Sequence, residues 1–288
     1  MNARLSLEGV CRTYRRGGLF TRAEALHVLR GVDLDLAEGA SLGLVGRSGC
    51  GKSTLGRVIL GLERPNAGTV RFLGEDVASP ARRAEFRRSV QAVFQNVRDS
   101  VNPRMTAGEI VAEPLRNFFS LTKGEAVERS RPLLEQVGLK ATDADKYPSQ
   151  FSGGELQRVC IARALAPNPR VVVFDEAVSS LDMLVQARVL KLIERIRDEQ
   201  GLAFLFISHD LRVVAGLCRE VALMADGVIA ARGRSVEELA ATGHPVIEEL
   251  LASLPPRSRA TEGEIRRIIP PYADAARAPL RPNAGLIF

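Results

Sequence analysis

The sequence predicts an α/β protein with a mostly parallel β-sheet and a block of inserted helices. Three observations predict this fold. An apolar run breaks into a glycine-rich turn and then a helix, strand-like and helical segments alternate later in the chain, and a helical stretch separates these two parts. Strands that alternate with helices favour a parallel sheet covered on both faces. The composition agrees, because 45% apolar and 26% charged residues among 288 are ordinary for a globular chain.

Residues 1–95 are expected to form the first part of this α/β core. The polar segment Tyr14–Arg22 is expected to be a loop, and Pro65–Gly68 a turn. Apolar patterning predicts one helix, Lys52–Leu62, and several strands. The strands are expected at Leu5–Val10, Val28–Leu36, Ser41–Val45, Thr69–Leu73 and Val90–Phe94.

Residues 96–168 are expected to form a helical subdomain inserted into the core, and residues 169–234 to complete the core. A C-terminal extension, residues 235–288, begins with a short helical region and ends in a Pro/Arg/Ala-rich tail, expected to be extended or poorly ordered. The predicted helices of these parts are Ala107–Phe119, Lys123–Val137, Gly154–Leu165 and Leu181–Asp198. The predicted strands are Val171–Phe174, Ala203–Ile207, Val221–Met224 and Val228–Ala231.

Composition excludes some classes of protein and leaves others open. A net charge of +6 fits nucleic acid, anionic lipid or nucleotide as a partner, or only a solvated surface, and does not choose among them. The four cysteines are scattered without a C-x-x-C pair, which argues against a disulfide framework or a structural zinc site and favours reduced thiols in the cytosol. The most apolar stretches are strand-length, far short of the ~20 residues that span a bilayer, so the chain is not expected to cross a membrane. Residues 1–10 carry no apolar signal-peptide region.

A phosphate-binding loop of the pattern G-x-x-x-x-G-K-[ST] follows the strand Ser41–Val45. Its glycines allow successive backbone N–H groups to face one anion, and the following helix adds the positive end of its dipole. Lys52 is expected to reach the β- and γ-phosphates of ATP, and the Ser53 hydroxyl to bind Mg²⁺. The expected ATP-binding residues of this segment are Gly46, Arg47, Ser48, Gly49, Cys50, Gly51, Lys52, Ser53 and Thr54.

A second motif is the apolar strand at Val171, which ends in Asp175 and Glu176. A buried parallel strand delivers its C-terminal side chains to the edge of the sheet that carries the phosphate loop. Asp175 is expected to hold Mg²⁺ through water, and Glu176 to orient or deprotonate the attacking water. Together the two motifs predict an ATPase.

The segment Phe151–Arg158, with the sequence FSGGELQR, resembles the signature motif of ATP-binding-cassette (ABC) ATPases, and the order of the other motifs agrees. The resemblance implies a RecA-like P-loop core with a small antiparallel β part beside the helical subdomain. It also implies that Ser152, Gly153, Gly154 and Glu155 contact the γ-phosphate of ATP bound by a second ATPase subunit. Ser152 stands at a helix N-cap, with bare N–H groups behind it.

Four further residues match the family at expected places. Gln95 resembles the glutamine that binds the Mg²⁺/water site and couples it to transport, and Asp182 lies in the loop that crosses the dimer interface. His209 resembles the switch histidine that contacts the γ-phosphate. Tyr14 resembles the aromatic residue that stacks on adenine, although an ordinary loop tyrosine is an equally good interpretation. Cys50 is either a reactive thiol or a plain filler of the loop.

The resemblance covers about Leu5 to Arg234, with two departures from the family pattern. The signature begins with Phe151 and has Glu155 where leucine and glutamine are usual. Since a carboxylate beside ATP phosphates is unfavourable, Glu155 is expected to face ribose or solvent. The carboxylate strand continues into Ala177 and Val178 in place of the commoner Pro-Thr, which is expected to leave the chemistry intact.

The segments after Gln95 and around His244 resemble ABC importers for dipeptides, oligopeptides and nickel, and within that group nickel importers most closely. The resemblance implies a subunit at the cytoplasmic face of the inner membrane that couples ATP hydrolysis to transport. Its partners would be a second ATPase, identical or related, two integral-membrane permeases and a substrate-binding protein. Nucleic acid is not expected as a partner. Nickel and peptide both remain candidate cargoes, and with three histidines the chain is not expected to bind nickel itself.

Three other kinds of ATPase are weighed against an importer subunit. A DNA-repair or chromosome-maintenance ATPase would carry a coiled coil or zinc module between Gln95 and Phe151, and that interval is too short and lacks cysteine. A translation-associated ATPase would have two cassettes, whereas the sequence has one phosphate loop. An exporter ATPase is opposed only by the resemblance to the importer group.

Overall fold

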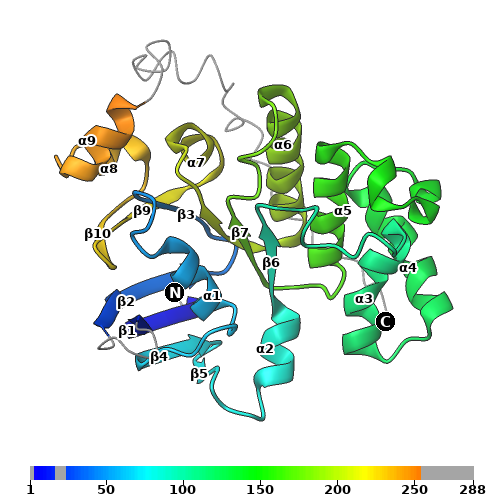
Figure 1. The fold of residues 1–288 in the computed structure, drawn as a ribbon, viewed down its shortest axis with the longest axis horizontal. Coiled ribbons are helices and arrows are strands. Elements are labelled where there is room, and N and C mark those ends of the chain that lie inside the picture. The colour runs from blue at the N-terminus through cyan, green and yellow to red at the C-terminus, as the bar shows by residue number, and fades with distance from the viewer. Residues whose placement is uncertain (1–2, 17–23, 254–288) are drawn as a thin grey trace.

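A computed structural model describes residues 3–16 and 24–253 and contains two β-sheets (Figure 1). The strands are β1 Ala3–Arg16, β2 Glu24–Ala37, β3 Ser41–Val45, β4 Ala67–Phe72, β5 Glu75–Asp76, β6 Val90–Phe94, β7 Val171–Asp175, β8 Ala203–Ile207, β9 Glu220–Ala225 and β10 Val228–Gly233. The helices are α1 Lys52–Ile59, α2 Arg83–Ser89, α3 Ala107–Phe119, α4 Lys123–Gln136, α5 Gly153–Leu165, α6 Met183–Gln200, α7 Leu211–Leu217, α8 Val236–Ala240 and α9 Pro245–Ala252.

The larger sheet has six strands in the order β10-β9-β3-β8-β7-β6. All neighbours pair in parallel except β9 and β10, which pair antiparallel. Every residue of β3 and β8 is buried, as their unbroken apolar sequences predict for strands covered on both faces. The prediction of a mostly parallel sheet is confirmed, and the sheet brings the ends of β3, β6, β7 and β8 to one edge.

The smaller sheet is antiparallel, in the order β2-β1-β4-β5, and lies at the lower left of Figure 1. Its β1 strand is longer than the sequence predicted. Tyr14, expected in a loop, pairs with Leu26, and the pairing continues to Arg16 and Glu24. The polar composition of this segment suggested a loop. Its backbone N–H and C=O groups nevertheless pair with β2, and this pairing does not depend on apolar side chains. The rest of the predicted loop, residues 17–22, lies outside the described residues.

Helices α3, α4 and α5 gather beside the β6 edge of the large sheet, on the right of Figure 1. Each begins with a capping box, in which the N-cap hydroxyl accepts from the N3 backbone and the N3 glutamate accepts from the N-cap backbone. The pairs are Thr106 with Glu109, Thr122 with Glu125, and Ser152 with Glu155. Short 3₁₀ turns at Ala141–Asp145 and Pro148–Gln150 connect α4 to α5.

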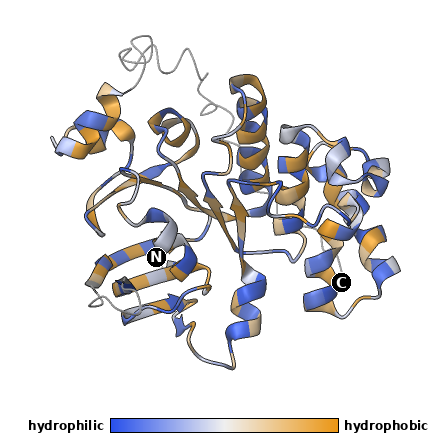
Figure 2. Cartoon of the chain, viewed as in Figure 1, coloured by the Kyte–Doolittle hydropathy of each residue, from blue (hydrophilic) through white to orange (hydrophobic). Residues whose placement is uncertain are grey.

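Two clusters of buried apolar side chains hold these layers together. One lies between the antiparallel sheet, α1 and one face of the parallel sheet, and includes Leu29, Leu44 and Leu55. The other joins the opposite face of that sheet to the helical region and includes Val111, Leu156 and Phe206. Figure 2 shows the parallel strands as mainly apolar and α2 as mainly hydrophilic.

The C-terminal extension packs through α8 and α9, where Leu239 and Ile247 are fully buried. The predicted tail, Pro255–Phe288, lies outside the described residues. None of the described helices combines the length and the apolar character that crossing a bilayer requires.

Candidate functional site

The predicted phosphate loop connects β3 to α1 and curls tightly against neighbouring strands. A Cβ atom at Gly46 would lie 2.2 Å from the Met224 carbonyl oxygen, and one at Gly51 would lie 2.9 Å from the Val28 carbonyl oxygen. Gly51 also has a φ of 111°, which L side chains rarely adopt. The backbone of β2 and β9 thus leaves room for glycine only, and this is the reason the motif needs glycine at these two positions.

Lys52 crosses the concave side of this loop. Its Nζ donates to the Gly46 carbonyl oxygen at 2.7 Å and to the Arg47 carbonyl oxygen at 2.8 Å, and it lies 3.9 Å from the Cys50 sulfur. The side chain of Lys52 is buried, whereas Ser48 is exposed. The loop therefore concentrates a positive charge and the N-terminus of α1 in one cradle, an arrangement suited to an anion.

Asp175 ends β7 beside this cradle, because β7 and the phosphate-loop strand β3 both flank β8. Ser53 Oγ donates to Asp175 Oδ1 at 3.4 Å. Burial raises the pKa of Asp175, and the neighbouring Glu176 carboxylate raises it further, against the opposing effects of Ser53 and nearby cations. A hydroxyl and a half-buried carboxylate side by side form the kind of oxygen-donor set that binds Mg²⁺.

Glu176 follows Asp175 with a left-handed backbone, φ 49°, unusual for a residue other than glycine. Its N–H donates to the Ile207 carbonyl oxygen at 2.9 Å, which ties the turn after β7 to the end of β8. Its Oε1 lies 3.4 Å from Nδ1 of His209. Two of the three side chains predicted to act in catalysis, Glu176 and His209, are thus brought together, and Gln95 is the third.

Gln95 follows β6, whose last residue Phe94 pairs with Asp175 in parallel register. The structure therefore places Gln95 at the same edge of the sheet, one strand beyond the two carboxylates, with its side chain exposed. Its exposed position is compatible with a coupling role between the sheet edge and the helical region that follows it.

The signature segment lies at the start of α5. Ser152 Oγ accepts from the Glu155 N–H at 3.3 Å, and Glu155 Oε2 accepts from the Ser152 N–H at 2.9 Å. Hydrogen bonds from the Ser152 backbone and then its hydroxyl lower the pKa of Glu155, so this carboxylate stays ionised. Glu155 is exposed and is folded back onto its own helix start.

Asp182 caps the start of α6, where its Oδ1 accepts from the N–H groups of Leu184 and Val185. The starts of α5 and α6 are in contact, because a Cβ at Gly154 would meet the Val185 side chain at 2.2 Å. The predicted signature and interface-loop residues therefore lie on neighbouring helix starts.

Tyr14 lies in β1, where its hydroxyl donates to Glu63 Oε2. Glu63 follows α1 and was not identified from the sequence. No local pattern joins residues 49 positions apart, so this contact could only be found in the fold. The capping role of Glu155 could have been found, because Ser-x-x-Glu before an apolar run is the known sign of a capping box.

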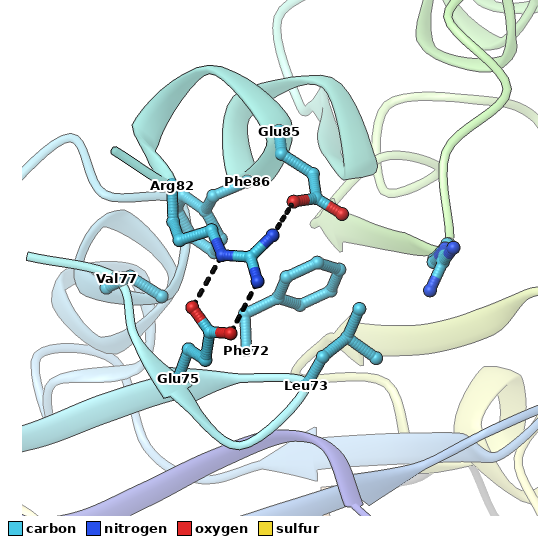
Figure 3. Close-up of a pocket in the computed structure, with 8 residues that line it drawn as sticks. Phe72, Leu73, Glu75, Val77, Arg82, Glu85 and Phe86 are labelled. Atoms are coloured by element: carbon cyan, nitrogen blue, oxygen red, sulfur yellow. Dashed lines mark hydrogen bonds and ion pairs between the residues drawn. The ribbon is translucent and has the colours of Figure 1, made fainter. Parts of the chain in front are cut away.

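A cavity of about 230 Å³ lies elsewhere, among residues of β4, β5 and α2 (Figure 3). Arg82 crosses it and donates to both Glu75 and Glu85. None of the predicted site residues lines this cavity, so the candidate site is the phosphate-loop edge of the sheet.

Comparison with known protein families agrees with this geometry. The family model described as ABC transporter matches residues 29–179, which run from within β2 to the turn after Glu176. The chain belongs to the ABC transporter family. It is accordingly an ATP-binding, ATP-hydrolysing cassette with the P-loop fold that the motifs predicted.

The chain is similar over most of its length to curated members of this family. It is 43% identical over 278 residues to a nickel import ATP-binding protein of Rhodospirillum rubrum, covering 96% of this chain and 95% of that one. It is 42% identical over 263 residues to the nickel import ATP-binding protein NikE of Escherichia coli K12, covering 90% and 98%.

Two solved cassettes are similar in fold. The ATP-binding cassette MJ0796, in a dimeric post-hydrolysis state bound to ADP and Pi, is 28% identical with a TM-score of 0.69, covering 80% of this chain and 98% of that one. CbiO1 of Clostridium perfringens, part of the ABC transporter complex cbiONQ, is 25% identical with a TM-score of 0.72, covering 88% and 97%.

Proposed function

We propose that this cassette is the ATP-hydrolysing subunit of an importer that carries nickel ion across the cytoplasmic membrane. The observation that carries the proposal is the similarity, above 40% identity and over nearly the whole chain, to proteins named as nickel import ATP-binding proteins. The subunit would act at the cytoplasmic face as a peripheral component. Its proposed partners are a second cassette, identical or related, two integral-membrane permeases and a substrate-binding protein.

The nucleotide would be held by the cradle of the phosphate loop. Lys52, which already sits on its concave side, would turn its charge to the β- and γ-phosphates, and the N-terminus of α1 would add its dipole. Ser53 and Asp175, 3.4 Å apart, would hold Mg²⁺ together with Gln95. Bound there, Mg²⁺ supplies charge neutralisation for the phosphate oxygens during transfer.

Glu176 would orient and deprotonate the water that attacks the γ-phosphate. Its side chain is about one-quarter exposed, which permits contact with water, and His209 at 3.4 Å can fix the carboxylate and contact the γ-phosphate. General-base catalysis contributes roughly 10²–10⁴ in rate. The strained turn at Glu176 and its bond to Ile207 hold the carboxylate at the sheet edge.

The second half of each nucleotide site would come from the partner cassette. Ser152 and Gly153 are exposed at a capped helix start, with Gly154 buried behind them, and Asp182 is exposed at the neighbouring start of α6. A γ-phosphate gripped by the phosphate loop of one subunit and by this helix start of the other would close the pair. Its removal by hydrolysis would loosen the pair, and the helical region after Gln95 would transmit the change to the permeases.

Peptide is the alternative cargo, since the same motifs also resemble dipeptide and oligopeptide importers. The test is co-purification of the full chain with its cognate permeases and second cassette, followed by reconstitution in vesicles with their binding protein. ATP-dependent uptake of nickel but not of a dipeptide would support the proposal. Uptake of the dipeptide alone would show that the cargo is peptide and not nickel. A chain that neither binds nor hydrolyses ATP within that complex would contradict the whole proposal.

A further inference from the structure

Glu63, which lies four residues beyond the end of α1, is the acceptor at the centre of a polar cluster that the proposed chemistry does not use. Its Oε1 accepts from Arg57 Nε at 2.7 Å, and its Oε2 accepts from Arg12 Nε at 3.0 Å and from the Tyr14 hydroxyl. The Glu63 side chain is 18% exposed. Burial alone would raise the pKa of Glu63, but the bonds from Tyr14 and Arg57 outweigh it and lower the pKa, so the acceptor is a carboxylate.

This cluster connects Tyr14 to the phosphate loop through hydrogen bonds. Arg57, which bonds Glu63, also donates from Nη2 to Thr54 Oγ1 at 3.2 Å. Thr54 is buried in the first turn of α1, next to Ser53. The tyrosine of the antiparallel sheet and the helix that starts at the phosphate loop are therefore held in one geometry by a single carboxylate, although they belong to different layers of the fold.

Arg12 fixes the orientation of the tyrosine ring as well as its position. Its guanidinium carbon lies 4.8 Å from the centroid of the Tyr14 ring, the geometry of a cation–π contact. Arg12 is itself held by Glu63 and by a bond from Nη1 to the Arg64 carbonyl oxygen at 3.0 Å. One face of the ring is thus covered by a cation, and a base that stacks on this ring takes the opposite face.

We infer that Glu63 is a positioning residue for the nucleotide base, locking Tyr14 and Arg12 into a platform at a fixed distance from the phosphate loop. This inference rests on the proposed function, in that it takes ATP to bind the phosphate loop with its adenine on Tyr14. A platform that is already ordered loses little rotamer freedom when the base stacks, and this is how Glu63 would increase affinity. Glu63 itself touches neither base nor phosphate.

The experiment measures dissociation constants of MgADP and MgCDP for the full chain by calorimetry, since neither ligand is consumed. Tyr14→Phe removes only the hydroxyl that Glu63 accepts, and Glu63→Ala removes the acceptor. Each is expected to weaken ADP binding by about three- to tenfold, the range of one aromatic stacking contact. The double variant is expected to be no weaker than the worse single variant, because both changes break the same bond.

A purine stacks over more area than a pyrimidine, so the ratio of ADP to CDP affinity is expected to fall in both variants. General loss of structure would weaken both ligands alike and leave that ratio unchanged. The matched control is Glu75→Gln, which disturbs another Arg–carboxylate pair, that with Arg82, away from the phosphate loop (Figure 3). It is expected to bind both ligands as wild type does.

The outcomes separate this inference from the proposed function. Wild-type ADP affinity in Tyr14→Phe, with the ADP to CDP ratio unchanged, would overturn the inference. Tyr14→Phe leaves the ion pairs of Glu63 intact, so it tests the idea even where Glu63→Ala does not fold. A wild-type chain that binds no ADP, or an ADP affinity that is unchanged in Lys52→Ala, would instead defeat the proposed nucleotide site.

Discussion

The edge of the parallel sheet and the start of α5 carry the two halves of the predicted site, and they are built differently. At the sheet edge the functional side chains contact one another: Ser53 bonds Asp175, and Glu176 lies against His209. At the start of α5, the side chains of Ser152 and Glu155 bond within their own capping box. Among the described residues, no hydrogen bond or ion pair joins residues 151–158 to the phosphate loop.

This difference shows that the parallel strands and the start of α5 position their functional residues in different ways. Parallel register fixes where β3, β7 and β8 end, so residues far apart in sequence meet without any further device. The signature segment is instead ordered by its own capping box, with Ser152 and Gly153 exposed. In the proposed function, the sheet edge would hold the nucleotide within one chain, and the start of α5 would meet the nucleotide of a second cassette.

The largest expected effect comes from the sheet edge. Glu176→Gln keeps the size of the side chain and removes its basicity, so ATP hydrolysis is expected to fall by roughly 10²–10⁴-fold while ATP still binds. Phosphate release measures the hydrolysis rate, and equilibrium binding measures ATP affinity. Light scattering is expected to detect dimers of the variant that persist in the presence of ATP. Glu128→Gln, which alters an exposed ion pair with Arg131, serves as the control. Normal hydrolysis by the Gln variant would end the assignment of Glu176 as base.

Lys52→Ala is expected to have the next largest effect, on affinity. The ammonium makes two charge-assisted bonds to the loop, and comparable bonds to phosphate are each worth about 1.5–3 kcal/mol. Since Lys52 would give up its bonds to the loop carbonyls when it turns to phosphate, the net loss is expected to equal about one such bond. ATP affinity is therefore expected to fall by roughly 10–100-fold, measured by calorimetry in the full chain. Because Lys52 is buried, thermal unfolding should be recorded alongside. Unchanged ATP affinity in a folded variant would contradict the proposal that Lys52 binds the phosphates in the phosphate loop.

The signature half can be separated from ordinary helix capping by a matched pair of substitutions. Ser152→Ala and Thr122→Ala each remove the hydroxyl of a capping box, from α5 and α4 respectively. Each is expected to lower the free energy of unfolding by about 1 kcal/mol. Only Ser152→Ala is expected to lower ATP turnover as well, by about tenfold, because only Ser152 would face the partner's nucleotide. Equal turnover in the two variants would mean that Ser152 is a cap and nothing more.

The smallest expected effect concerns the protonation of Asp175. Its pKa is raised in the folded state, mainly by burial, so the folded protein holds this proton more tightly than the unfolded chain does. Folding stability from this group therefore decreases as the pH rises through the folded pKa. Without nucleotide and Mg²⁺, Asp175→Asn is expected to raise Tm at pH 7 by about 1–3 °C.

That difference in Tm is expected to shrink as the pH falls through the raised pKa of Asp175, which a pH series of thermal unfolding would measure. Asp145→Asn, which removes an exposed carboxylate paired with Arg131, is expected to change Tm little. A lower Tm for Asp175→Asn at neutral pH would contradict this prediction, because it would show that the ionised carboxylate stabilises the folded protein.

The sequence predicted best the elements with a strong apolar pattern. The bounds of β3, β6, β8 and α3 agree with the structure. β3 and β8 are fully buried strands, β6 is a partly buried apolar strand, and α3 is strongly amphipathic. Helix α2 was missed because Phe86 is its one large apolar residue, and tertiary contact with Phe72 supplies what the pattern lacks. Helix α7 was missed because it is short, and its start is fixed by the Asp210 cap.

For the site, the motifs identified the residues, whereas their contacts came from the fold. The phosphate loop and the Asp175–Glu176 pair carry their chemistry in consecutive residues, so a local pattern suffices. The cluster around Glu63 joins β1 to the end of α1, and no local sequence pattern indicates it. The positive φ of Glu176 was also beyond reach, because the residue type gives no sign of it.

That backbone angle has a consequence for how this protein can evolve. A left-handed residue other than glycine costs on the order of 1 kcal/mol, so Glu176 is a position where sequence drift towards glycine would meet no thermodynamic resistance. In the middle of a helix or strand, by contrast, replacing a residue with glycine lowers the free energy of unfolding by about 0.5–1 kcal/mol. Natural selection on turnover alone would then preserve the glutamate, and a lineage released from that selection would be expected to lose it early, while keeping a well-folded cassette.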